Sequence, residues 1–201
     1  MSSTKDRNGK LSPDRGRIAP IRLAHVVRRT TRFEEMIAWY RTVLGAEIVH
    51  ADDVLAFLTY DEEHHRIAIA RLPGLEEQSP AAAGTDHVAF TYPDLGDLLC
   101  TYSRLKREGI EPFWSINHGP TTSLYYKDPD GNKVELQVDN FATADECNAW
   151  MHSGAFAANP IGVVFDPEDL LARYRAGEPL ETLAARPPLP EGASSFDMLR
   201  F

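Results

Sequence analysis

The sequence contains few cysteines and no long apolar run. Only Cys100 and Cys147 are cysteines among 201 residues, which excludes a disulfide framework and a cysteine-based zinc site. The apolar runs are short, as at 54–58 and 161–165, whereas a membrane-spanning helix needs roughly 18 apolar residues. The first residues lack the apolar stretch of a secretory signal. These absences favour a cytoplasmic protein over a membrane or secreted one.

Basic residues are also in deficit. Lys and Arg number 21 against 30 Asp and Glu, so the formal net charge is −9. A negative chain repels nucleic acid and anionic membrane surfaces, and neither is expected as a partner. Apolar residues make up 43% and charged residues 25%, as in ordinary globular proteins. We therefore expect a folded protein that acts on a small molecule.

Apolar residues follow the spacing of an amphipathic helix twice, 62 residues apart. The two sets are Phe33, Met36, Ile37, Tyr40 and Leu44, then Leu95, Leu98, Leu99, Tyr102 and Leu105. A capping box of Thr31 and Glu34 is expected to start the first helix, and Asp94 the second. Gly45 and Gly109 supply the two ends.

Short strand patterns surround each helix in the same order. They cover 23–27, 47–50, 54–60 and 66–72 in the first copy, and 88–92, 111–116, 121–127 and 133–138 in the second. A repeat at a fixed offset indicates an internal duplication. We predict an α+β fold in which two tandem βαβββ modules, at about 21–72 and 84–139, form one domain (21–139). The alternative is two unrelated helices in an α+β domain.

The flanking segments differ in character. Residues 1–20 are polar and aperiodic and are predicted to be a mobile tail. Residues 140–201 form a C-terminal extension with short helices, one opened by a capping box of Thr143 and Glu146 and one by Asp166 and Pro167. A proline-rich stretch and an apolar end follow. We expect the extension to act as a lid or as a contact in a homo-oligomer.

Two histidines and one glutamate are the candidate metal ligands. His25 and His87 occupy matching positions in the first strand of each module, so a pseudo-two-fold axis would bring them together. Glu135 lies among apolar residues of a strand, where a carboxylate is costly unless it is paired or bound to a metal. Two imidazoles and a carboxylate are the ligand set of non-haem Fe(II). Taken singly, each residue could instead be an ordinary core histidine or exposed carboxylate.

The first module lacks a counterpart of Glu135. Aligning the two copies places Ala68 at the equivalent position. A fourth protein ligand is therefore missing where an isomerase of this architecture would require one.

A second group of residues surrounds the turn before Glu135. Asp128-Pro129-Asp130-Gly131 is a turn sequence. Tyr125 and Glu135 lie on its two flanking strands and can face one cavity, which His118 can overhang. The alternative is a plain hairpin with an exposed histidine and a packed tyrosine.

These residues carry a resemblance to a known family. The stretch from Ile116 to Glu135 resembles the signature of type I extradiol ring-cleaving dioxygenases, in their single-domain form. They belong to the vicinal oxygen chelate (glyoxalase/bleomycin resistance/dioxygenase) superfamily. The segments around His25 and His87 are similar to that family's two histidine-ligand strands. The resemblance covers about residues 22–139 and implies paired βαβββ modules. It also implies Fe(II) held by His25, His87 and Glu135, with Mn(II) as the alternative.

The resemblance also implies roles around the metal. It predicts O2-dependent cleavage of a catechol or a 2,3-dihydroxybiphenyl-like diol, in aromatic catabolism. His118 and Tyr125 would hydrogen-bond the diol oxygens. The acid–base residue would be His65, the second of a histidine doublet, although strict strand alternation puts His64 on the face of Ala68.

Other positions carry weaker expectations. Phe113, Trp114 and Tyr126 are candidate residues for lining the substrate pocket. His50 and His152 have no matching role and are expected at the surface. Val27 departs from several relatives of the family, which carry a polar residue two places after the first ligand.

Two other functions stay open. One is a glyoxalase- or epimerase-like isomerase that uses Zn(II), Ni(II) or Co(II), which Ala68 disfavours. The other is a non-catalytic, drug-sequestering binding protein of the same fold, which the intact ligand set disfavours.

Overall fold

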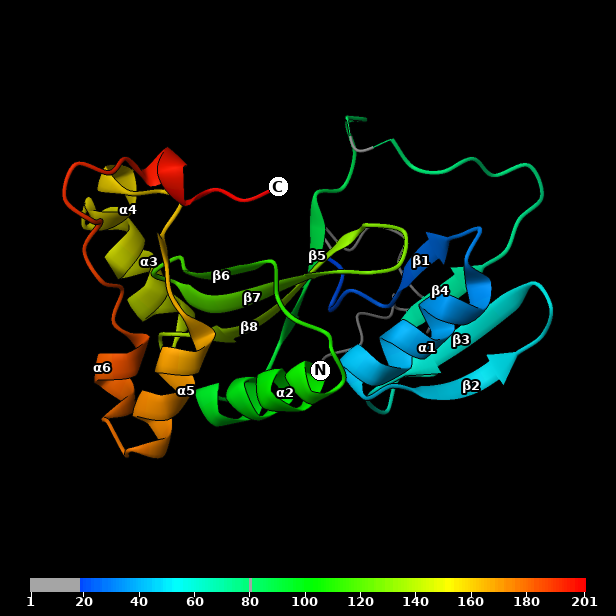
Figure 1. Cartoon of the computed structure of the whole chain (residues 1–201), viewed down its shortest axis with the longest axis horizontal. Helices are drawn as coiled ribbons and strands as arrows, with labels where there is room; N and C mark the ends of the chain where they lie inside the picture. Colours follow the sequence, from blue (N-terminus) through cyan, green and yellow to red (C-terminus); the bar gives the residue numbers. More distant parts are fainter. Residues whose placement is uncertain (1–18, 80) are drawn as a thin grey trace, which may run out of the picture.

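The first module forms a four-stranded sheet with one covering helix. The computed structural model describes residues 19–79 and 81–201. The sheet has the strand order β1-β4-β3-β2, and α1 packs on one face (Figure 1). The elements are β1 (Val26–Arg29), α1 (Phe33–Leu44), β2 (Glu47–Ala51), β3 (Leu55–Thr59) and β4 (Ile67–Ala70).

The second module repeats this plan. Its strands have the order β5-β8-β7-β6-β9, in which β9 belongs to the C-terminal extension. The elements are β5 (His87–Thr91), α2 (Leu95–Arg107), β6 (Trp114–Asn117), β7 (Thr121–Lys127) and β8 (Lys133–Asp139). The predicted α+β fold of paired βαβββ units is confirmed.

The two modules share one hydrophobic core. The helices α1 and α2 lie on the same side of the two sheets (Figure 1), and Met36 and Leu98 belong to one buried cluster. Polar contacts reinforce the junction: the Tyr40 hydroxyl donates to Asp128 Oδ2 at 3.1 Å, and Arg104 donates to the Thr42 carbonyl at 2.6 Å. The helix side of both sheets is therefore filled, and the opposite faces are left for function.

Two predictions about where the elements of the first module begin are wrong. The predicted capping box of Thr31 and Glu34 is wrong, because Arg32 is the N-cap of α1 and makes no side-chain capping bond. Glu34 instead pairs with Arg71. The first strand begins at Val26 rather than at residue 23, so His25 immediately precedes the ladder. Asp94 does cap α2, by accepting from the Asp97 amide at 2.9 Å.

The C-terminal extension packs against the β6 end of the second sheet (Figure 1). Its elements are α3 (Ala144–His152), α4 (Ala155–Ala158), β9 (Val163–Val164), α5 (Pro167–Arg175), α6 (Leu180–Ala184) and the 3-10 turn η1 (Ser195–Met198). The capping box of Thr143 and Glu146 and the Asp166 cap are confirmed. Residues 1–18 of the predicted N-terminal tail lie outside the described residues. Within the described part of the chain, no helix combines the length and apolarity needed to cross a membrane.

The shared core makes a quantitative prediction for stability. Leu98 is 1% exposed, so Leu98→Ala leaves a cavity and is expected to lower the free energy of unfolding by about 2–5 kcal/mol. Leu180→Ala, at a position 57% exposed, is the matched control and should stay within about 0.5 kcal/mol. Urea unfolding of both variants measures the difference. Equal values for the two would contradict the core assignment.

Candidate active site

A row of side chains crosses the second sheet on the face opposite α2. Cross-strand pairing places Trp114 beside Tyr125, Tyr125 beside Glu135, and Glu135 beside Ala89. Directly paired residues point to the same face of a sheet. His87 lies two residues before Ala89 and therefore joins this face. One aromatic, one phenol, one carboxylate and one imidazole are thus brought together from four strands.

The imidazole and the carboxylate are in contact. His87 Nε2 lies 3.1 Å from Glu135 Oε2, and Glu135 is only 4% exposed. The other ring nitrogen, Nδ1, lies 2.8 Å from Asp86 Oδ2. Hydrogen bonds from His87 and Lys133 lower the pKa of Asp86, so this carboxylate stays charged. When a carboxylate accepts a hydrogen bond from one nitrogen of an imidazole, the lone pair of the other nitrogen is available to coordinate a cation.

Tyr125 and His118 form a second polar contact at the same place. His118 Nε2 lies 3.1 Å from the Tyr125 hydroxyl. Burial, followed by the negative charge of Glu135, raises the pKa of Tyr125 far above its ordinary value. The phenol is therefore a hydrogen-bond donor at neutral pH. Trp114 and Phe113 pack around its ring, with centroids 4.6 and 6.4 Å away, and make an aromatic wall.

His25 and His65 lie together on the first module. Their ring centroids are 4.3 Å apart, and His65 also stacks on Phe57 at 4.6 Å. Burial is the first cause that lowers the pKa of His65, which keeps the ring neutral. Arg66 supports the segment before His25 by donating to the Leu23 and Ala24 carbonyls at 2.7 and 3.0 Å.

The structure distinguishes the two members of the histidine doublet. The side chain of His64 is 69% exposed beside Glu63 and contacts the ring of His65, whereas His65 also packs against the rings of His25 and Phe57. Strict alternation does not apply, because β4 begins only at Ile67 and residue 66 is a bend. His65 is thus the member that shares a surface with His25.

The three candidate metal ligands are not all gathered. Within residues 19–79 and 81–201, no three His, Cys, Asp or Glu side chains are grouped closely enough to hold a metal ion. His87 and Glu135 meet on the second sheet, and His25 stays with His65 on the first. The strand that follows His25, β1, and the strand that begins with His87, β5, are edge strands of separate sheets. No backbone ladder therefore sets the spacing between them.

Strand register confirms the position of Ala68. It pairs with Val27 in the first module, as Glu135 pairs with Ala89 in the second. The first module accordingly offers a methyl group where the second offers a carboxylate. His50 and His152 are exposed, as predicted, with His50 beside Asp52 and His152 bonded to the Asn148 carbonyl.

Tyr126 does not line the site. It is 1% exposed and belongs to the core between the sheet and the helices. Adjacent residues of a strand face opposite sides, so Tyr125 and Tyr126 cannot both reach the row. The prediction of Tyr126 as a pocket residue is wrong.

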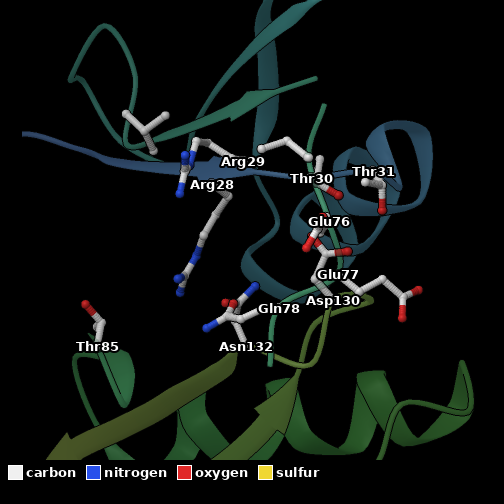
Figure 2. A pocket seen from close by; sticks show the side chains of 12 residues that line it. Arg28, Arg29, Thr30, Thr31, Glu76, Glu77, Gln78, Thr85, Asp130 and Asn132 are labelled. Carbon is white, nitrogen blue, oxygen red and sulfur yellow. The ribbon is translucent and has the colours of Figure 1, made fainter. Parts of the chain in front are cut away.

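A separate cavity of about 360 Å³ lies between β1 and the segment that joins the modules (Figure 2). Arg28 and Arg29 line it with Glu76, Glu77 and Asp130. None of the predicted site residues contributes to this lining. Because the lining contains both basic and acidic side chains, it does not indicate the charge of a ligand.

Sequence reasoning missed two partners of the site. Asp86 directly precedes His87, and an acid beside a candidate ligand is a signal that was available. The Ile161 carbonyl, which accepts a hydrogen bond from His118 Nδ1, carries no such signal. A backbone group 43 residues away becomes a partner only through the tertiary fold.

Comparison with known proteins agrees with this fold. Residues 22–136 match the family described as the Glyoxalase/Bleomycin resistance protein/Dioxygenase superfamily. The chain therefore belongs to this superfamily, as its sequence motifs predicted.

Within this superfamily, the chain is similar to two dioxygenases that act on aromatic diols. The chain is 52% identical over 163 residues to biphenyl-2,3-diol 1,2-dioxygenase 2 of Rhodococcus globerulus, covering 81% of this chain and 86% of that protein. Biphenyl-2,3-diol 1,2-dioxygenase 3 of the same organism is 49% identical, covering 82% and 88%. Among solved structures, the fosfomycin resistance protein FosX from Listeria monocytogenes matches with a TM-score of 0.51 and 19% identity, covering 67% of this chain and 100% of that chain. This last match shows the fold alone.

The core position of Tyr126 predicts that removing its hydroxyl and removing that of Tyr125 will change the free energy of unfolding in opposite directions. The buried Tyr126 hydroxyl has no hydrogen-bond partner among residues 19–79 and 81–201, so Tyr126→Phe should leave the free energy of unfolding unchanged or raise it by up to about 1–3 kcal/mol. Tyr125→Phe, its matched control, loses the bond to His118 and should lower it by about 0.5–1.5 kcal/mol. Urea unfolding of metal-free protein measures both. A large loss of stability in Tyr126→Phe would refute the assignment.

Proposed function

We propose that this protein is an extradiol dioxygenase, which opens an aromatic ring at the bond beside a vicinal diol. The observation that carries the proposal is the 52% identity to a biphenyl-2,3-diol 1,2-dioxygenase over most of both chains. Cleavage at positions 1 and 2 of a 2,3-diol breaks a carbon–carbon bond next to the hydroxyls. Both oxygen atoms of O2 enter the product, so the reaction requires no external reductant. The substrates are a catechol or a 2,3-dihydroxybiphenyl-like diol and O2.

We further propose a mononuclear Fe(II) as the cofactor, with Mn(II) as the alternative. The His87–Glu135 contact, with Asp86 behind the imidazole, fits a divalent cation in donor chemistry and orientation. His25 would be the third ligand, across the gap between the modules. A metal held there would be chelated by the two diol oxygens and would supply a path for electron density between the diol and O2.

The surrounding residues would orient the diol and exclude water. Tyr125 stays protonated and would hydrogen-bond a diol oxygen, with His118 as its own hydrogen-bond partner. The rings of Trp114 and Phe113 offer an apolar wall to the aromatic substrate. His65, neutral and beside the ring of His25, would accept a proton from the diol and return it to the oxygen atoms during ring opening.

The isomerase alternative is disfavoured by Ala68, since the register leaves no fourth ligand opposite Glu135. The binding-protein alternative is disfavoured by the contact of His87 with the buried Glu135. A cytoplasmic location and self-association as a homo-oligomer stay predictions from the sequence.

A direct assay tests the proposed reaction. Protein loaded anaerobically with Fe(II) is expected to turn 2,3-dihydroxybiphenyl or catechol yellow in air, with one O2 consumed per diol. Glu135→Ala should lose both the metal and the colour, because it removes a buried ligand. Asp139→Ala, which removes an exposed carboxylate from the same strand, is the control and should keep both. Metal retention by Glu135→Ala would contradict the ligand assignment, and diol turnover without O2 uptake would contradict the reaction.

The histidine doublet offers a matched test of the acid–base role. His65→Gln is expected to slow ring cleavage by at least about tenfold, since general acid catalysis typically contributes 10²–10⁴-fold. His64→Gln, at the exposed neighbouring position, should keep nearly full kcat. Steady-state O2 uptake with saturating diol measures both. An equal loss of kcat in the two variants would contradict the assignment of the acid–base role to His65.

A further inference from the structure

The C-terminal extension contacts the ring of His118 directly. The Ile161 carbonyl lies within hydrogen-bond distance of His118 Nδ1. A carbonyl oxygen can only accept, so Nδ1 carries the proton. Burial lowers the pKa of His118, which makes the neutral ring the main form at neutral pH. In that form Nε2 has a free lone pair, and it accepts from the Tyr125 hydroxyl 3.1 Å away.

The loop that presents the Ile161 carbonyl is built rigidly. Asn159 is 5% exposed, and its Oδ1 accepts from the Ile161 and Gly162 amides at 3.1 and 2.8 Å. Its Nδ2 donates to the Gly162 carbonyl at 2.9 Å. Gly162 has a φ of +121°, and a Cβ there would come within 2.5 Å of the Asn117 carbonyl oxygen. The loop therefore fits tightly against the end of β6.

One arginine ties this loop to the turn that carries His118. Arg186 Nη1 donates to the Asn159 carbonyl at 2.7 Å and to the His118 carbonyl at 3.2 Å. Its Nη2 donates to the Ala155 carbonyl at 3.0 Å. The guanidinium also lies over the Trp150 ring, 4.8 Å from the centroid. A single half-buried side chain thus joins three backbone segments and an aromatic ring.

We propose that Arg186 and the loop 159–162 are positioning elements that hold His118 as the Nδ1–H tautomer, with Nε2 directed at Tyr125. The extension then has a role in the site that is neither that of a lid nor that of a subunit contact. The catalytic consequence rests on the proposed function: His118 accepts a proton or a hydrogen bond from Tyr125 or from the diol, and it does not donate one. The tautomer itself depends only on the contacts described above.

Nuclear magnetic resonance of metal-free protein tests the tautomer without any activity. Long-range proton–nitrogen correlation on isotopically labelled histidine distinguishes a protonated Nδ1 from a protonated Nε2, and His118→Gln identifies the signals by their loss. We expect the wild-type protein to show a protonated Nδ1 and an unprotonated Nε2. A wild-type ring protonated at Nε2, or at both nitrogens at neutral pH, would overturn the proposal even if no variant folds.

Arg186→Lys tests the positioning role. Lysine keeps the charge but lacks the planar fork that reaches three carbonyls, so His118 should show a mixture of tautomers. In Fe(II)-loaded protein, kcat should fall by roughly tenfold or more. Arg173→Lys is the matched control, because Arg173 pairs with Glu178 in the same extension and does not touch the His118 turn. It should leave both the tautomer and kcat unchanged.

The two readouts separate the inference from the proposed reaction. An unchanged tautomer in a folded Arg186→Lys variant would refute the positioning role, whatever the activity. Wild-type protein without ring cleavage, but with the expected tautomer and its loss in Arg186→Lys, would refute the reaction and leave the positioning role supported.

Discussion

A buried carboxylate between the apolar residues Val134 and Leu136 of β8 is the constraint around which the second module is arranged. Glu135 is 4% exposed, and burying its charge is costly unless partners compensate. The strand register supplies them, with Tyr125 directly opposite on β7 and His87 reached from β5. Asp86 then fixes the far nitrogen of the imidazole. Each partner is placed by backbone pairing, so the polarity of this face follows from where the strands align.

The two modules share a fold but not a surface chemistry. The row of Trp114, Tyr125, Glu135 and Ala89 in the second module corresponds, in that order, to a paired row in the first: His50, Phe57, Ala68 and Val27. The second module has a carboxylate in this row at the position where the first has a methyl group. Such an asymmetry suits a ligand with a polar diol edge and an aromatic body. Duplication therefore supplied the scaffold, and divergence at a few paired positions supplied the site.

The sequence predicted what depends on periodicity and repetition. Both long helices, the paired modules and the equivalence of Ala68 with Glu135 all follow from the 62-residue offset and strand alternation. Alternation also shows why Tyr126 belongs to the core. The prediction that Tyr126 lines the pocket did not take this alternation into account. The Thr31 cap failed because Glu34 pairs with Arg71, a partner distant in the chain. Contacts of this kind have no periodic signature.

The spacing between the modules was the least predictable feature, and the chemistry depends on it. Neighbouring strands in one ladder lie about 4.8 Å apart, but β1 and β5 share no ladder. The distance from His25 to the His87–Glu135 contact is therefore set by side chains that cross the junction. Tyr40 bonds Asp128 at the turn that leads into β8, and Arg32 bonds the Pro129 carbonyl in the same turn. Since these contacts hold α1 to the strand of Glu135, the first module is positioned by its helix rather than by its sheet.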